Sequence, residues 1–125
     1  MLADKRGFII MEVLSSILIL SICIVAISFA ITTSTKQLAV SMQRLKAIEM
    51  AHGKLEETIG TEFETITSIP RTDFPASNGS YQYSVYVQND NDCRYLKRIH
   101  VTVYFTESIS GLEKTVAIVG ARAKR

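Results

Sequence analysis

One carboxylate within a long apolar run has the most unusual chemical setting in this 125-residue sequence. Glu12 is the only charged residue between Phe8 and Ile31, and the basic pair Lys5 and Arg6 stands shortly before the run. A carboxylate costs about 2.5 to 3.5 kcal/mol at the centre of a membrane helix and less near its end. Glu12 therefore needs either an opposite charge beside it or a side-chain path to the membrane interface, and the pattern alone leaves both open.

Residues suited to catalysis or metal binding form no recognisable constellation. Neither His52, expected on a helix, nor His100, expected on the outward face of a strand, has a nucleophile or carboxylate at a mechanistic spacing. Cys23 and Cys93 match no metal pattern, and their very different surroundings make a disulfide between them implausible. The cluster 89–92 lacks the glycine and distal glutamate of an EF-hand, so a solvated turn is favoured over calcium. We expect no enzyme activity, cofactor or metal.

The apolar run 8–31 predicts a transmembrane helix. Its 24 residues would span about 36 Å, enough to cross a hydrocarbon core of about 30 Å. Lys5 and Arg6 before the run predict a cytoplasmic N-terminus. The polar stretch 32–36 follows it, so the rest of the chain is expected outside the cytoplasm.

Two other export signals compete for the same segment. An ordinary signal peptide could be cut after Ala30 and release a soluble exported domain, but its apolar stretch is usually 7 to 15 residues long. A lipoprotein signal would place a lipid on Cys23, where the preceding residue should be small, and Ile22 is not. The first remains an alternative.

The stretch GFIIMEVL resembles the cleavage and methylation motif of type IV pilins and type II secretion pseudopilins. The matching residues are Lys5, Arg6, Gly7, Phe8 and Glu12. The resemblance implies that a prepilin peptidase removes the leader 1–7 by cutting between Gly7 and Phe8, and then methylates the amine of Phe8. It also implies that Glu12 pairs with the N-terminal amine of an adjacent subunit during filament assembly.

The helix is expected to continue from about Phe8 to Ile59, with a membrane half at 8–31 and an amphipathic half at 32–60. Apolar residues recur there at steps of three or four, and Gly60 provides a stop. Polar residues between them predict a solvated face, which includes Gln43, Arg44 and Lys54. The predicted apolar stripe comprises Leu38, Met42, Leu45, Ile48, Ala51, Leu55 and Ile59.

Residues 61–125 are expected to form a loop and an antiparallel sheet. Two prolines and an Asn78-Gly79 turn signal predict a connection at 61–80, with a short helical turn near 62–66. Alternating apolar residues then predict three strands at about 81–87, 99–105 and 112–119. The expected fold is α+β and pilin-like, a long N-terminal helix packed on a three-stranded antiparallel sheet.

Charge is unevenly distributed along the chain. From Glu49 to Asp92 eight acidic residues oppose two basic ones, and from Arg94 to Arg125 seven basic residues oppose two acidic ones. Complementary packing within or between subunits is the simpler interpretation. The net charge of +2 makes nucleic acid an unlikely partner. A DNA-binding alternative, in a competence pilus, would use Arg94, Lys97, Arg98, Arg122, Lys124 and Arg125.

The expected function is structural. Lys54-Leu55-Glu56 resembles a tripeptide of minor pilins of the PilV kind and of the I-type pseudopilin, which favours a minor subunit. The resemblance implies a single-pass inner-membrane protein that later joins a pilus or pseudopilus. Its expected partners are other pilin subunits, a prepilin peptidase, the inner-membrane assembly platform and, before assembly, membrane lipid.

Overall fold

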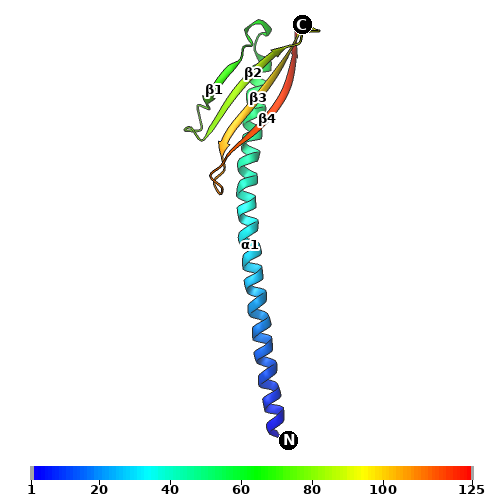
Figure 1. Ribbon diagram of the computed structural model, residues 1–125, viewed down its shortest axis with the longest axis vertical. Coiled ribbons are helices and arrows are strands. Elements are labelled where there is room, and N and C mark those ends of the chain that lie inside the picture. The colour runs from blue at the N-terminus through cyan, green and yellow to red at the C-terminus, as the bar shows by residue number, and fades with distance from the viewer. Residues whose placement is uncertain (1, 125) are drawn as a thin grey trace. The chain divides into compact units, whose positions relative to one another are not determined.

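The computed structural model describes the backbone of residues 2–124 and the side chains of residues 5–124. Helix α1 (Leu2–Gly60) comes first and is followed by a short 3-10 helix, η1 (Phe63–Thr65). Four strands complete the described part of the chain (Figure 1). The chain divides into two compact units, the first ending at Leu38 and the second beginning at Ala39. The strands are β1 (Ile69–Asp73), β2 (Tyr81–Asn89), β3 (Leu96–Thr106) and β4 (Glu113–Ala123).

The first unit is a helix whose described side chains are all exposed. Phe8 and Phe29, near the two ends of the apolar run, are 73% and 74% exposed. The helix is long and apolar enough to cross a membrane, as the sequence predicted. It begins at Leu2 rather than near Phe8, because the residues before the run carry no helix breaker stronger than Gly7.

The sheet of the second unit has four antiparallel strands in the order β1-β2-β3-β4, one more than the sequence predicted. The extra strand is β1, which lies in the segment expected to be a loop and pairs Ile69 with Val85 and Asp73 with Gln82. Pro70 cannot donate a backbone hydrogen bond, so it is tolerated only at an edge or an irregularity. Strand β1 provides both, because it is an edge strand and its register shifts between Ile69 and Thr72.

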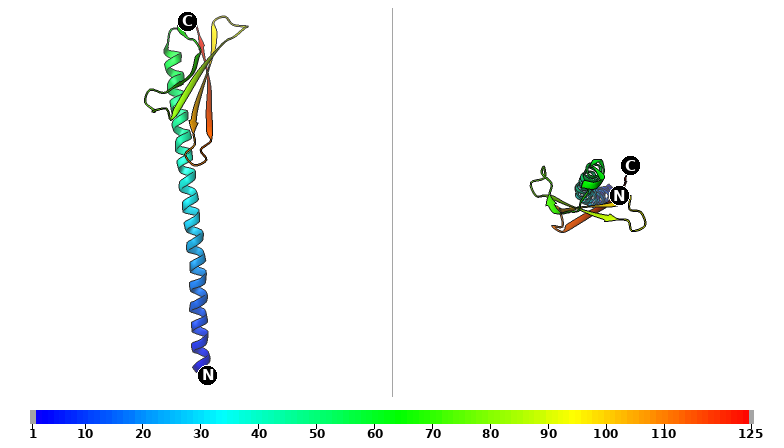
Figure 2. Two further views of the ribbon diagram at one scale, coloured as in Figure 1. Left: turned by 60° about the vertical axis from the view of Figure 1, so that its left-hand side comes forward. Right: turned by 90° about the horizontal axis from the view of Figure 1, so that it is seen from above.

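The core of the second unit lies between the sheet and the part of α1 that belongs to this unit, which covers one face of the sheet (Figure 2). Ala47 and Ala51 on the helix are fully buried, and these small side chains allow close approach to the strands. Strand β3 supplies Ile99, Val101 and Val103, all with no exposed area. The alternation predicted for β2 and β3 is confirmed by this burial pattern.

The apolar stripe predicted on the helix is wrong in its first half. Leu38, Met42 and Leu45 are 59%, 64% and 64% exposed. At 100° per residue, Leu45 lies about 200° from Ala47 and therefore faces away from the sheet. The helix packs on the sheet with the face that carries the small residues Ala47 and Ala51, because small side chains allow the closest approach. Ala51, Leu55 and Ile59, the C-terminal part of the predicted stripe, do pack in or against the core.

Two residues assigned to the solvated helix face instead contact the sheet side of the unit. Gln43 binds Ser108 twice, accepting a hydrogen bond from its backbone N–H at 3.1 Å and donating another to its hydroxyl. The ammonium of Lys54 lies 4.8 Å from the ring centre of Tyr83 and 2.9 Å from Glu57. Long polar side chains therefore extend the contact between helix and sheet beyond the apolar core.

Two local predictions in the segment 61–80 are confirmed. Residues Phe63–Thr65 form one turn of 3-10 helix, where a short helical turn was expected. Asn78 and Gly79 both have positive φ, 49° and 80°, and the N–H of Ser80 donates to the carbonyl of Ser77 at 3.0 Å. Two successive positive φ values define the type I′ turn that Asn-Gly favours.

Gly120 of β4 is required by close packing, which gives a stability prediction. A Cβ at this position would lie 2.8 Å from Cδ1 of Leu55 and 3.2 Å from Cδ1 of Ile59. Gly120→Val should lower the free energy of unfolding by about 1–3 kcal/mol, because Leu55 is buried and has little room to move. Urea unfolding of the full chain in detergent would measure this change.

The matched control is Gly53→Val, since a Cβ at Gly53 meets no neighbouring atom within 4 Å. Valine forms helix slightly better than glycine, so this variant should be as stable as the wild type or slightly more stable. Equal stability of the two variants would contradict the tight packing assigned to Gly120.

Candidate functional site

The residues of the N-terminal motif lie on exposed helix. Lys5 to Glu12 all belong to α1, and a side chain placed at Gly7 would meet no other atom within 4 Å. Phe8, the next residue, is largely exposed. The motif is thus accessible from all sides of the helix. Its residues depend on no tertiary contact for their positions.

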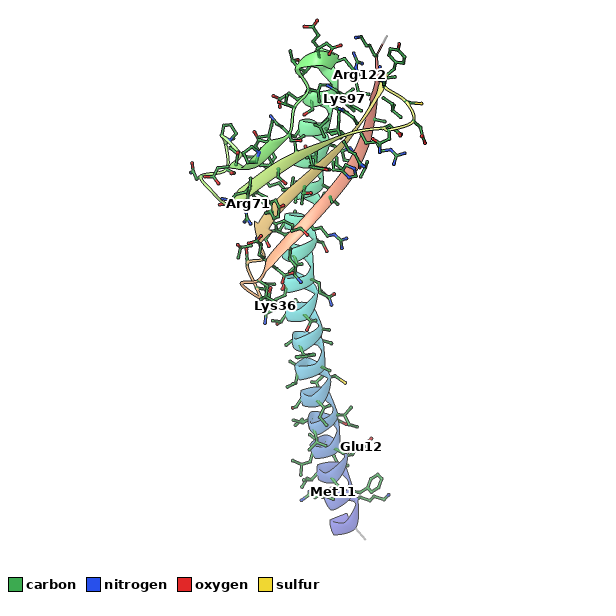
Figure 3. The ribbon with its side chains drawn as sticks, turned by 45° about the horizontal axis from the view of Figure 1, so that its top comes forward. Met11, Glu12, Lys36, Arg71, Lys97 and Arg122 are labelled. Carbon is green, nitrogen blue, oxygen red and sulfur yellow. The ribbon has the colours of Figure 1, made fainter. Side chains whose placement is uncertain are left out.

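The carboxylate of Glu12 has no hydrogen-bond or ion-pair partner among the described residues. Figure 3 shows its side chain projecting from the helix beside Met11. Its backbone carbonyl, by contrast, accepts hydrogen bonds from the hydroxyls of Ser15 at 2.9 Å and Ser16 at 2.8 Å. The carboxylate is therefore the one strongly polar group of the apolar run that the described chain leaves unsatisfied.

Every hydroxyl in the run 8–31 is satisfied within the helix. Ser21 donates to the carbonyl of Ile17 at 2.8 Å and Ser28 to that of Ile24 at 2.9 Å, in addition to the two bonds at Glu12. Such bonds to the preceding turn leave no hydroxyl proton exposed to an apolar surrounding. The serines can therefore lie in lipid or against another helix without seeking outside partners.

One surface of the first unit carries the small residues Ser21 and Ala26 beside the larger Ile22, Val25 and Phe29. Small residues on a membrane helix allow a second backbone to approach closely. This open surface is one against which another apolar helix can pack.

The basic residues proposed for DNA contact do not form one open patch. Lys97 on β3 donates from Nζ to the carbonyls of Phe63 at 2.7 Å and Ile66 at 3.2 Å, and so fastens the η1 segment to the sheet. Arg122 on β4 lies directly opposite Lys97 in the strand register (Figure 3), and its Nε is buried without a partner among the described residues. Arg125 lies outside the described residues.

Two further members of that basic group form ion pairs with the acidic part of the chain. Lys124 lies 2.5 Å from Glu64, and Arg98 lies 3.5 Å from Asp90. This is the complementary packing that the uneven charge distribution predicted, seen here within one chain. Arg94, Lys97 and Lys124 do share a cleft of about 570 Å³, whose walls also include Phe63, Glu64, Asn89, Asp90, Asn91 and Tyr95.

The pair Lys124–Glu64 predicts a small pH dependence of stability. The hydrogen bond from Lys124 lowers the pKa of the Glu64 carboxyl below its ordinary value of 4.5. A carboxyl with a lowered folded pKa stabilises the fold above its ordinary pKa, and this contribution is lost as the pH falls through the folded value. Lys124→Met should therefore lower Tm slightly at pH 7, with the difference from wild type vanishing on acidification below 4.5.

Arg94→Gln is the control for that titration, because Arg94 has no ion-pair partner among residues 5–124. Thermal melts of both variants across the pH range would compare them. A Tm difference for Lys124→Met that stayed constant through acid pH would contradict the assigned ion pair.

The remaining candidates of the sequence lie apart from one another. Cys23 and Cys93 are both free and exposed. His100 lies on the sheet face opposite the core, with its ring 6.0 Å from the ring of Tyr86 and its Nε2 buried without a partner among the described residues; no carboxylate or nucleophile accompanies it in the described contacts. In the turn after β2, Asp90 accepts from the backbone N–H of Asp92 at 3.3 Å. The described residues include no group of three His, Cys, Asp or Glu side chains arranged to hold a metal ion.

Comparison with known proteins gives no relative. No protein-family model, curated protein or solved structure matches the chain.

Sequence reasoning missed several residues that hold the second unit together. Gln43 was predicted on the solvated helix face and Lys97 as a possible DNA contact, and Ile66 was placed in a connecting loop although it is 4% exposed. No periodic signal marks such residues, because each acts alone in joining segments that are distant in the sequence. The run of Thr, Ser and Pro around Ile66 also hides its apolar side chain from any window average.

Proposed function

We propose that this protein is a minor subunit of a type IV pilus or type II secretion filament and polymerises through its N-terminal helix. The subunit is held in the inner membrane with its N-terminus in the cytoplasm. A prepilin peptidase cuts between Gly7 and Phe8, and methylation of the new amine follows. The mature chain then joins other pilin-type subunits at the membrane assembly platform.

The observation that carries the proposal is the exposed apolar helix with a single unpaired carboxylate. All hydroxyls in the run are satisfied internally, and only the carboxylate of Glu12 lacks a partner among the described residues. Cleavage after Gly7 would place a new positive amine four residues before Glu12, about 6 Å along a helix. The amine of a neighbouring subunit, displaced by about one turn, would then be the natural partner of that carboxylate.

Exposed apolar residues beyond the membrane run support side-by-side packing of helices. Met42 and Leu45 belong to α1 within the second unit, yet their side chains face away from the sheet. In a filament these side chains would be covered by the helices of neighbouring subunits. An isolated exported domain would gain nothing from them.

The DNA-binding alternative has weaker support. Lys97, Arg98 and Lys124 already bind carbonyl or carboxylate oxygens of their own chain, so each phosphate contact would compete with an internal one. Among the cations of the shared cleft, only Arg94 makes neither a hydrogen bond nor an ion pair with the described residues. Salt-sensitive retention of the full chain on DNA would favour this alternative.

Intact-mass and N-terminal peptide analysis of the protein from its own cells tests the proposal. A chain that begins at Phe8, with or without one methyl group, is the expected result. A chain that begins at Ile31 would show an ordinary signal peptide and overturn the proposal. An unprocessed chain beginning at Met1 would also contradict it.

A further inference from the structure

The loop between β3 and β4, residues 107–112, is closed on itself by its own hydrogen bonds. The N–H of Glu107 donates to the carbonyl of Leu112 at 2.9 Å, and the N–H of Gly111 donates back to the carbonyl of Glu107 at 2.8 Å. Gly111 has a φ of 66°, in the region that favours glycine. The hydroxyl of Ser110 binds the carboxylate of Glu107. The loop therefore has a defined shape and satisfies much of its polarity internally.

The same loop presents its apolar side chains to the outside. Ile109, within the internally bonded turn, is 51% exposed, and Leu112, at its end, is 60% exposed. Solvent-facing loops normally carry polar side chains and satisfy their backbone through water. This loop has the opposite arrangement, which suits an apolar or interfacial surrounding.

The loop is fixed to the first turns of α1 that belong to the second unit. Ser108 is bound to Gln43 through its backbone N–H and its hydroxyl, and the loop lies beside α1 in both side views (Figures 1 and 2). Gln43 is only four residues past Ala39, the first residue of the unit. Gln43 lies twelve positions after Ile31, the end of the apolar run, which corresponds to a rise of about 18 Å along a helix. The loop is therefore bound to a part of the chain that lies only a short sequence distance from the apolar run.

Cations stand at the base of the loop. Arg44 on α1 and Lys114 on β4 line a groove of about 320 Å³, together with Val40, Phe105, Glu107, Thr115 and Val116. Neither cation has an ion-pair partner among residues 5–124. The one carboxylate in the groove, that of Glu107, accepts a hydrogen bond from Ser110, so two cations stand against one carboxylate. A groove with this excess of positive charge beside an exposed apolar loop is complementary to an anionic phospholipid surface.

We propose that the β3–β4 loop is a second membrane contact, in which Ile109 and Leu112 enter the bilayer interface while Arg44 and Lys114 bind lipid phosphate. The contact holds the second unit against the membrane before assembly. It rests on the proposed function only in requiring that the run 8–31 be inserted in a bilayer.

The chain contains no tryptophan, so single introduced tryptophans can report the surroundings of each position. Ile109→Trp probes the loop, Tyr95→Trp probes a loop residue that is also exposed, and Ile19→Trp probes the membrane run. Each full-length variant is reconstituted in vesicles of acyl-brominated phosphatidylcholine with about 30% phosphatidylglycerol, a composition that presents an anionic surface. Fluorescence quenching by bromine is then compared among the three.

The Ile109→Trp fluorophore should be quenched about threefold more than the Tyr95→Trp fluorophore, and less than the deeply placed Ile19→Trp fluorophore. Adding Arg44→Gln and Lys114→Gln should reduce the quenching at position 109 toward that at position 95. Omitting phosphatidylglycerol should have the same effect, since both changes remove the same electrostatic attraction.

Three results would overturn the proposal. One is strong quenching at position 19 with equally weak quenching at positions 109 and 95. This result would support insertion of the membrane run and reject the loop contact. Absence of quenching at position 19 would reject the membrane anchor and the loop contact with it. The third result is that the tryptophan at position 109 is protected from an aqueous quencher but is not quenched by bromine. If that protection disappears when the protein is diluted in the vesicles, a second copy of the chain covers the loop instead of lipid.

Discussion

A Gly7→Leu protein should remain almost entirely as uncleaved precursor in the membrane, whereas the wild-type chain should be cut before Phe8. The expected fall in cleavage is roughly tenfold for each 1.4 kcal/mol of steric misfit in the peptidase site. The substitution does not disturb the chain itself, because a side chain at Gly7 meets no other atom within 4 Å. Leucine also forms helix better than glycine, by about 1 kcal/mol. Any loss of cleavage would therefore report recognition by the enzyme.

Gly53→Leu is the matched control, since Gly53 lies in the same helix with equally open surroundings. Immunoblots of membrane fractions resolve precursor from mature protein for both variants, and mass analysis fixes the N-terminus. Complete processing of Gly7→Leu at the native position would reject Gly7–Phe8 as the cleavage site. Precursor accumulation with Gly53→Leu would show that helix changes in general impair export.

Glu12→Ala should be processed normally and then fail to enter filaments. Removing one partner of a buried ion pair costs about 3–5 kcal/mol, because the other charge remains buried and unpaired. Since each 1.4 kcal/mol is a factor of ten in an equilibrium, incorporation should fall by about a hundredfold or more. The proportion of the protein in sheared filaments, relative to the membrane pool, measures this loss.

Met11→Ala is a control that removes side-chain bulk, but no charge, from the residue next to Glu12. Met11 is 69% exposed and uncharged, so its truncation should leave incorporation within a few-fold of wild type. Glu12→Gln, which keeps the shape and removes the charge, should behave like Glu12→Ala. Normal incorporation of Glu12→Gln would exclude charge pairing as the role of this residue, and a block in cleavage would assign Glu12 to peptidase recognition.

The parts of the fold that alternate or repeat in sequence were predictable. The period of two in Tyr81, Tyr83 and Val85, and again in Ile99 and Val101, gives both the strands and the face that is buried. The continuous helix followed from the lack of proline before Pro70. These features depend on the local chain alone, so a single sequence contains them.

The parts that depend on distant contacts were not predictable. Strand β1 carries Pro70 and no alternating pattern, and it is a strand because β2 offers it a free edge. The helix face was misassigned because large apolar residues such as Met42 and Leu45 outweigh Ala47 in any periodic count. Within the candidate site, the sequence identifies Glu12 and its spacing from Gly7. Its partner cannot be read from one chain, because a second chain supplies it in the proposed filament.

The four serine hydroxyls that bind carbonyls of their own helix have a consequence for assembly and disassembly of the proposed filament. A subunit that leaves the bilayer for a filament exchanges lipid for neighbouring helices, and these serines break no hydrogen bond in doing so. Nearly all of the electrostatic change then falls on Glu12. In the proposed filament, adding or removing a subunit would therefore make or break the Glu12 pair, while the helix keeps its own serine hydrogen bonds and need not refold.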